Sequence, residues 1–235
     1  MNIGILLAGG VGKRLKADKP KQFLELSGKM MFVYSFGAMA ASGLVDDIII
    51  VADEAYRELI EDALLSEESG DKFLCFAEPG ENRQLSIYNA LKEIELMGLS
   101  DSTDIVLIQD AARPFTTTEL IEQCIQGCYE HQGAMPCLPM CDTVYFSKGG
   151  KEVEKLLDRG SIYAGQAPEA FRFKEYFEAN KALLPKKILN IKGSTEPAVK
   201  AGMDIAMIEG DQKNFKVTTA ADFERAVQIM EKGMN

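Results

Sequence analysis

Histidine and paired cysteines are nearly absent from this chain. It contains one histidine, His131, and five cysteines without a Cys-x-x-Cys pair. A zinc site needs several such ligands at short spacing, and an odd number of cysteines does not build a disulfide framework. We therefore expect no zinc centre and no disulfides, and we interpret the cysteines as buried free thiols.

Long apolar runs and a secretion signal are absent as well. The longest uncharged run, residues 30–45, has 16 residues and includes two serines and two glycines, so it is too short and too mixed to span a bilayer. The apolar residues 3–7 follow no basic residue and precede no small-residue cleavage pattern. These features predict a cytoplasmic protein that does not bind a membrane.

Positive charge is in the minority. The 26 Lys and Arg residues face 36 Asp and Glu residues, which gives a net charge of −10. The surface as a whole therefore disfavours nucleic acid, and any anion-binding site must be local. The length of 235 residues and the 46% hydrophobic content are typical of a globular protein. Because no repeat or linker interrupts the chain, we expect a single domain over residues 1–235.

Short β-branched runs alternate with stretches of helical periodicity. The predicted strands are residues 3–7, 47–51, 72–76, 104–108, 134–139 and 204–208. The predicted helices are residues 32–42, 55–65, 83–97 and 117–130. This alternation predicts an α/β fold with a mostly parallel, Rossmann-like sheet that is covered by helices on both faces. Ligands of such sheets bind at the carboxyl ends of the strands.

One segment interrupts this alternation. Residues 143–146 and 152–156 are predicted to form a hairpin around a Gly-Gly turn. A two-stranded arm is only marginally stable alone in water. We therefore expect an arm at about residues 143–163 that packs against a second subunit, which implies a homodimer.

A glycine-rich loop follows the first predicted strand. Gly9, Gly10 and Gly12 permit a positive φ and close backbone approach to a phosphate. Two familiar phosphate motifs do not fit, however. A dinucleotide fingerprint needs a third glycine at Leu15, and a Walker A motif needs Ser or Thr at Arg14. The first mismatch argues against a dinucleotide-dependent oxidoreductase.

The same loop is strongly basic. Residues 13–21 contain five cations and one aspartate, a local charge of +4 in an acidic protein. This concentration of charge beside a glycine loop predicts a polyanion site, although a solvated basic loop would give the same pattern.

Two other segments place charged groups after predicted strands. Asp110 and Arg113 can fix a hydroxylated anionic substrate, or they can form an internal pair that closes the turn. Lys216 precedes a helix that is predicted to open near Ala220, and from there it can reach a phosphate.

Several motifs, taken together, resemble one enzyme family. They are LLAGGVGKRLKADKPKQFLEL, DAARPF, CDTV, LDRGSIYAGQAPEAF and NFKVTT, in this order. The chain is similar over nearly its whole length to the cytidylyltransferases that make CDP-methylerythritol and, more distantly, to those that make CDP-ribitol. The resemblance implies a nucleotidyltransferase that forms a CDP-alcohol and pyrophosphate from CTP and a polyol phosphate.

The resemblance also implies roles for individual residues. The implied catalytic residues are Arg14, Lys21 and Lys216. The implied nucleotide-binding residues are Leu7, Ala8, Gly9, Gly10, Gly12, Lys13, Glu81, Ser86, Asp110 and Ala111. The implied polyol-phosphate ligands are Asp110, Arg113, Thr143 and Arg159, the last of them serving the site of the partner subunit. Mg²⁺ is the implied cofactor, held mainly by the phosphates with Asp110 as a potential ligand.

Departures from the family pattern leave the acceptor open. The usual Gln-Thr-Pro-Gln reads Gln-Ala-Pro-Glu at residues 166–169, and residues 193–197 replace the usual Thr-Asp-Asp/Glu-Ala. The best hypothesis is 2-C-methyl-D-erythritol 4-phosphate, an intermediate of isoprenoid precursor synthesis. The alternative is ribitol 5-phosphate or another alditol phosphate used for cell-wall or capsule polymers. A non-catalytic nucleotide-binding homologue is the hypothesis from another class.

Overall fold

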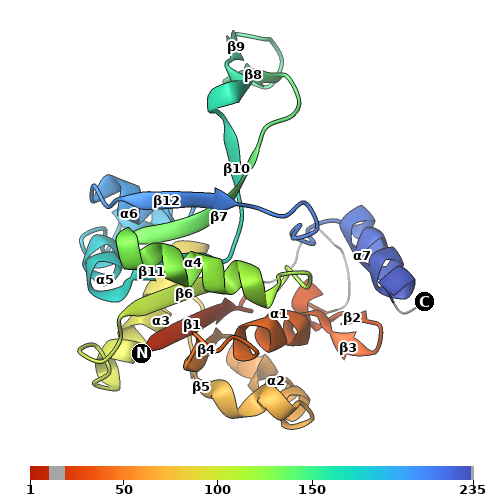
Figure 1. Cartoon of the computed structure of the whole chain (residues 1–235), viewed down its shortest axis with the longest axis vertical. Coiled ribbons are helices and arrows are strands. Elements are labelled where there is room, and N and C mark those ends of the chain that lie inside the picture. Colours follow the sequence, from red (N-terminus) through yellow and green to blue (C-terminus); the bar gives the residue numbers. More distant parts are fainter. Residues whose placement is uncertain (11–18, 234–235) are drawn as a thin grey trace.

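A mixed eight-stranded sheet forms the centre of the computed structural model, which describes residues 1–10 and 19–233 (Figure 1). Six strands run parallel and match the predicted segments: β1 (Asn2–Leu7), β4 (Asp47–Val51), β5 (Phe73–Ala77), β6 (Ile105–Asp110), β7 (Gly133–Pro139) and β12 (Ile205–Glu209). In the register of the sheet, Leu7 lies beside both Val51 and Asp110. The carboxyl ends of β1, β4 and β6 therefore meet at one edge, and the predicted mostly parallel sheet is confirmed.

Two short antiparallel strands join the sheet at β7, and one of them, β11, lies between β6 and β7. β10 (Tyr163–Gly165) pairs with β7, and β11 (Glu169–Arg172) pairs with β6 and β7. The sequence did not indicate them, because each has at most four residues and their segment contains no β-branched run. The expected alternation of strand and helix therefore fails here. The sheet order is β10-β7-β11-β6-β1-β4-β5, with β12 on the other side of β7.

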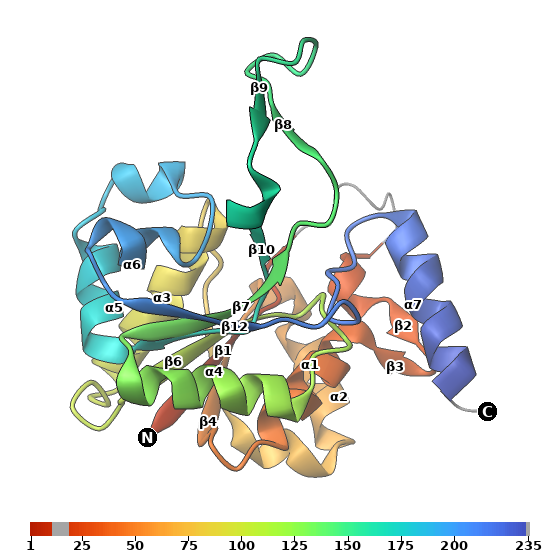
Figure 2. The ribbon, with the colours of Figure 1, turned by 45° about the horizontal axis from the view of Figure 1, so that its top comes forward.

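Helices cover both faces of the sheet (Figure 2). α1 (Met31–Ala40), α2 (Arg57–Leu65) and α4 (Thr118–Glu130) pack on one face, and α3 (Arg83–Leu96), α5 (Phe173–Lys181) and α6 (Glu196–Lys200) on the other. Successive residues of β4 alternate between the two cores, so Ile48 and Ile50 face α1 while Ile49 and Val51 face α3. The four predicted helices are confirmed to within two residues at each end, whereas α5 and α6 were not predicted.

Short 3-10 helices make several of the connections. They are η1 (Lys21–Phe23), η2 (Glu54–Tyr56), η3 (Glu68–Lys72), η4 (Arg159–Ser161) and η5 (Lys187–Asn190). In the described part of the chain, no helix has the length and apolar character needed to cross a membrane.

The last helix, α7 (Ala220–Gly233), begins where the sequence predicts and lies beside a small hairpin of β2 (Glu25–Leu26) and β3 (Lys29–Met30) (Figure 2). Leu26, Val217 and Ala226 are buried together in a third apolar cluster between these elements. This cluster anchors the segment that carries Lys216 against the body of the protein.

A two-stranded arm projects from the sheet (Figures 1 and 2). It consists of β8 (Val144–Phe146) and β9 (Lys155–Leu157), which pair in antiparallel fashion. The first strand lies where the sequence predicts, but the second begins three residues later than the expected start at residue 152. The turn is therefore longer than the predicted Gly-Gly turn, and it extends over residues 147–154.

Candidate active site

A cavity of about 590 Å³ opens at the carboxyl edge of the sheet. Its lining includes these sequence-predicted residues: Leu7, Gly9, Gly10, Lys21, Glu81, Ser86, Asp110, Ala111 and Lys216. They come from the ends of β1 and β6, from η1, from the loop between β5 and α3, and from the segment before α7. The fold thus brings together at one edge residues that are more than 200 positions apart in the sequence.

The two described glycines of the loop after β1 differ in their role. A Cβ on Gly9 would lie 2.8 Å from the Cβ of Pro79, so the loops after β1 and β5 approach too closely for any side chain there. A Cβ on Gly10 would meet nothing within 4 Å. Neither residue is among those with a positive φ. Glycine is therefore required at position 9 for close packing, while Gly10 leaves open space for a ligand.

The side chain of Gln22 holds this loop in place. It is 3% exposed, and its Nε2 donates to the carbonyl oxygens of Ala8 and Gly10, the latter at 2.9 Å. Lys21, the residue before it, donates from Nζ to the carbonyl oxygen of Val217 at 2.7 Å. The basic segment around η1 is thereby fastened both to the glycine loop and to the Lys216 segment.

Asp110 is the centre of a cation cluster. This carboxylate is 6% exposed and forms ion pairs with Lys216 at 3.0 Å, Arg83 at 3.2 Å and Arg113 at 3.3 Å. Burial alone would raise the pKa of Asp110, but these three positive charges hold it well below its usual range. Asp110 is thus ionised, and the cluster retains a surplus of positive charge that suits a polyphosphate.

The buried side chain of Asn214 joins three motifs of the site. Its Nδ2 donates to the carbonyl oxygen of Ala167 at 2.7 Å, and its Oδ1 accepts from Thr116 Oγ1 at 2.9 Å. The carbonyl oxygen of Asn214 accepts from Arg113 Nη1 at 2.6 Å. Because Asn214 lies two residues before Lys216, these bonds fix the position from which the lysine reaches Asp110.

The loop after β5 is braced by Ser86. Its Oγ accepts from the backbone N–H of Gly80 at 2.9 Å and donates to the carbonyl oxygen of Asn82 at 3.0 Å. Asn82 in turn begins α3, since its Oδ1 accepts from the N–H of Leu85 at 2.8 Å. Glu81 lines the cavity beside this brace. The predicted pair Glu81 and Ser86 therefore belongs to the cavity wall.

Other predicted site residues lie elsewhere. Ala8 is buried below the loop, and Arg113 is 11% exposed and forms the internal pair with Asp110 that the sequence left as an alternative. Thr143 and Arg159 are on the exposed arm and do not line the cavity; Arg159 Nη1 donates to the carbonyl oxygen of Cys141 at 2.8 Å. Gly12, Lys13 and Arg14 lie outside the described residues.

Arg83 is the main residue of the site that the sequence did not indicate. It occupies an ordinary helix-start position, directly after the Asn82 cap, and no charge pattern connects it with Asp110, 27 residues later. Asn214 was part of a recognised motif but carried no sign of its buried role. Only the packing of α3 against β1, β4 and β5 brings Arg83 to the cavity.

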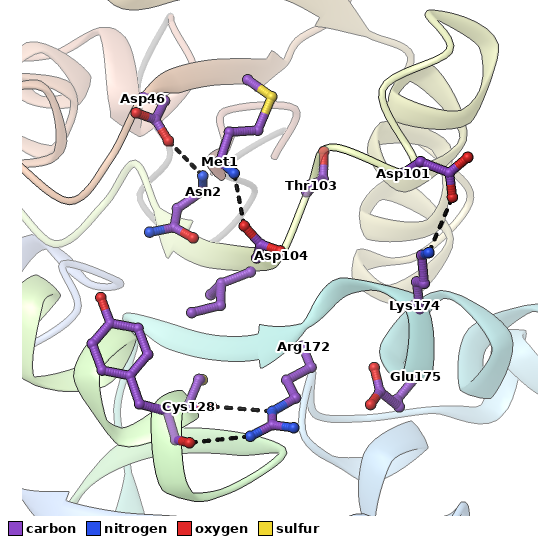
Figure 3. A pocket seen from close by; sticks show the side chains of 12 residues that line it. Met1, Asn2, Asp46, Asp101, Thr103, Asp104, Cys128, Arg172, Lys174 and Glu175 are labelled. Carbon is purple, nitrogen blue, oxygen red and sulfur yellow. Dashed lines mark hydrogen bonds and ion pairs between the residues drawn. The ribbon is translucent and has the colours of Figure 1, made fainter.

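A second hollow, of about 680 Å³, lies at the opposite edge of the sheet (Figure 3). Met1 and Ile105, at the amino-terminal ends of β1 and β6, contribute to its lining. Its charges pair locally, since the Met1 ammonium contacts Asp104 at 2.8 Å and Lys174 contacts Asp101 at 3.0 Å. No predicted site residue is found there, and ligands of parallel sheets bind at the carboxyl edge. The smaller cavity is therefore the candidate active site.

A dedicated metal cage is not evident in the described part of the chain. Within residues 1–10 and 19–233, no group of three or more His, Cys, Asp and Glu side chains is arranged to hold a metal ion. Both oxygens of Asp110 already face cationic side chains. These residues fit a divalent cation that is held mainly by phosphate oxygens and takes at most one carboxylate from the cavity.

The mostly parallel sheet, with a cavity at its carboxyl edge that Lys21, Arg83 and Lys216 help to line, is typical of a nucleotidyltransferase of the α/β class. The family model of 2-C-methyl-D-erythritol 4-phosphate cytidylyltransferase (IspD) matches residues 3–232. The chain belongs to this family of cytidylyltransferases.

Individual relatives agree with this assignment. The chain is 32% identical to the 2-C-methyl-D-erythritol 4-phosphate cytidylyltransferase of Geobacillus kaustophilus, over 98% of this chain and 97% of the relative. It is 28% identical to a ribitol-5-phosphate cytidylyltransferase of Streptococcus agalactiae, over 95% and 92% of the two chains. The crystal structure of 4-diphosphocytidyl-2C-methyl-D-erythritol synthase from Anaerococcus prevotii has the same fold, with a TM-score of 0.82, 21% identity and coverage of 98% and 96%.

Proposed function

We propose that this chain transfers the cytidylyl group of CTP to 2-C-methyl-D-erythritol 4-phosphate and releases pyrophosphate. The observation that carries the proposal is the set of cations at the cavity: Lys21, Arg83 and Lys216 line it, and Arg83 and Lys216 pair with the buried carboxylate of Asp110. Relatives named for this acceptor match over nearly the whole chain. Cations at the carboxyl edge of the sheet suit the binding of a triphosphate and a phosphate monoester.

In the proposed reaction, a phosphate oxygen of the acceptor attacks the α-phosphorus of CTP. The new P–O bond forms as the bond to the bridging oxygen of the β-phosphate breaks, and pyrophosphate leaves. No general base is required, because the attacking oxygen is already ionised near pH 7, its second pKa being about 6. The described cavity lining accordingly offers cations and contains no histidine.

Bringing two anions together is the main obstacle to this reaction. One pair of unit charges at 4 Å costs on the order of 4 kcal/mol at an effective dielectric constant near 20. Lys21 and Lys216 line the cavity and are proposed to stabilise the charge on the α-phosphate. Mg²⁺, when bound, would supply further charge neutralisation; we expect the phosphates to hold it mainly, with Asp110 as a candidate protein ligand. We assign the triphosphate to the glycine loop, including Gly12, Lys13 and Arg14.

We further propose that the arm, residues 143–163, joins two copies of this chain. It exposes five large apolar side chains: Tyr145, Phe146, Val153, Leu156 and Tyr163. A surface of this kind on a marginally stable hairpin is suited to burial against a second subunit. In this dimer, Thr143 and Arg159 would bind the polyol phosphate in the cavity of the partner subunit.

Ribitol 5-phosphate is the second candidate acceptor. It is favoured by the relative of that name at 28% identity and by the departures at residues 166–169 and 193–197. Ala167 is buried, however, and does not line the described cavity. Its missing hydroxyl is therefore a weak reason to change the acceptor.

A pyrophosphate-release assay with Mg²⁺ and a panel of phosphorylated polyols tests both parts of the proposal. CTP should support turnover about 100-fold better than UTP, because a mismatched base leaves buried polar groups unpaired. Equal rates with CTP and UTP would contradict cytidylyl transfer. A higher kcat/KM for ribitol 5-phosphate than for 2-C-methyl-D-erythritol 4-phosphate would reassign the acceptor alone.

A further inference from the structure

Asp110 has cation partners of two different kinds. Arg83 contacts Oδ1 through Nε at 3.3 Å and Nη2 at 3.2 Å, and its remaining nitrogen, Nη1, donates to Ser194 Oγ. Lys216 contacts Oδ2 at 3.0 Å with one ammonium group at the end of a flexible stem. The guanidinium is thus fixed on two sides, whereas the ammonium is free to rotate away.

A buried carboxylate supports Arg83 from behind. Glu169 is the first residue of β11, lies beside Ile108 in the register with β6, and is 9% exposed. Ser194 forms a hydrogen bond to this carboxylate, whose Oε2 has no partner. Burial raises the pKa of Glu169, and the charge of Arg83 opposes this shift. Arg83, Ser194 and Glu169 therefore form a continuous polar chain behind Asp110.

Lys216 has two roles that it cannot fulfil at the same time. Under the proposed function it acts at the α-phosphate, but without nucleotide it neutralises Asp110. Removing one partner from a buried ion is strongly unfavourable unless other charges remain in place. Arg113 contributes through Nε, but its Nη1 is bound to the carbonyl oxygen of Asn214. Arg83 alone reaches Asp110 with two nitrogens.

We propose that Arg83, held by Ser194 and Glu169, is a positioning residue that keeps Asp110 oriented while Lys216 moves to the phosphate of the nucleotide. This inference rests on the proposed function. It makes Arg83 the permanent counter-ion of Asp110 and Lys216 the exchangeable one.

The test combines kinetics with a readout that needs no substrate. Arg83→Gln should lower kcat by about 30-fold, because Asp110 loses the side chain that orients it. The KM for CTP should change by less than about threefold. Arg83→Lys should recover part of the loss, since it restores the charge but not the fork. In 13C NMR of labelled carboxyl groups at pH 7, assigned with Asp110→Asn, the Asp110 signal should shift in Arg83→Gln, because the carboxylate loses both contacts to the guanidinium.

Controls separate positioning from simple destabilisation. Arg57→Gln removes an arginine paired with Glu78 outside the described cavity and should leave kcat and the Asp110 signal unchanged. Ser194→Ala breaks the polar chain and should reproduce part of the Arg83→Gln effect.

Two results would overturn the inference: an unchanged Asp110 signal in Arg83→Gln, or a kcat within twofold of the wild-type value in that variant. If Arg83→Gln does not fold, the same measurements on Arg83→Lys decide, with an unchanged kcat counting against the inference. Absence of turnover by the wild-type protein with every acceptor would instead refute the proposed function. A shifted Asp110 signal would then still support the contact between Arg83 and Asp110.

Discussion

The cavity wall and the arm are built in opposite ways. Behind the wall, the fully buried Asn214 uses Nδ2, Oδ1 and its carbonyl oxygen in hydrogen bonds to two other segments, one at Ala167 and one at Arg113 and Thr116. In the arm, Tyr145 and Leu156 are 55% and 59% exposed, and each strand has only three residues. The wall is completed by the folding of one chain, whereas the arm leaves apolar surface that one chain does not cover.

This difference separates the site residues into two groups. Lys21, Asp110 and Lys216 are positioned by contacts within the protomer, so their geometry is set once the chain has folded. Arg159 is tied only to the backbone of Cys141 within the arm. If the arm docks on a second copy, substitutions in the wall should change chemistry or folding, and substitutions in the arm should change assembly and acceptor binding.

The largest effect is expected in the wall, at Lys216. Lys216→Ala should lower kcat about 100-fold or more, because it removes a positive charge that is proposed to stabilise the α-phosphate. Steady-state kinetics and thermal unfolding check this together, since folding should be little affected. Lys213→Ala, an exposed lysine of the same segment, is the matched control. An unaltered kcat in Lys216→Ala would make Lys216 a lysine without a catalytic role.

The second prediction concerns the stability of the wall. Asn214→Ala leaves Thr116 and the carbonyl oxygen of Ala167 without their buried partner, and this should lower the free energy of unfolding by roughly 2 kcal/mol. Urea unfolding measures it, with the exposed Gln212→Ala as the control. If Asn214→Ala lowers the free energy of unfolding no more than Gln212→Ala does, the buried hydrogen bonds of Asn214 do not stabilise the wall.

The arm gives the third prediction. Arg159→Ala should raise the KM for the polyol phosphate about tenfold and leave the KM for CTP nearly unchanged, because it removes one charged hydrogen bond to the acceptor.

A second variant tests the assembly itself. Replacing Tyr145, Phe146 and Leu156 by serine in one variant should convert a dimer into monomers in sedimentation and reproduce the Arg159→Ala kinetics. The exposed Leu65→Ser is the control. A fully active wild-type monomer would contradict the shared site.

The sequence predicts which segments form the cavity wall far better than it predicts the side-chain contacts that hold those segments together. The glycine loop, Asp110 and Lys216 follow strands whose apolar runs are unambiguous, so topology alone brings them to one edge. Arg83 and Gln22 depend on tertiary contacts that leave no periodic signal. β10 and β11 were missed for a similar reason: each is a short segment that is stabilised by pairing with neighbouring strands, β10 with β7 and β11 with both β6 and β7.

α7 is an intermediate case between wall and arm, and it gives the smallest expected effect. At its start, Asp222 accepts hydrogen bonds from the N–H groups of Thr218 and Thr219, while its own N–H donates to Thr219 Oγ1. Burial opposes these bonds, but they lower the pKa of Asp222 from 3.8 to about 2.

Because this pKa is lower in the folded state, the stabilisation is fully present above about pH 4 and is lost as the pH falls toward 2. Asp222→Asn should therefore lower the stability by about 1 kcal/mol at pH 7, and the difference from wild type should shrink on acidification. Chemical unfolding at pH 7, 4 and 3 measures this trend. Asp211→Asn, before the same helix, is the control. A difference that does not vary with pH would assign the effect to lost geometry rather than to charge.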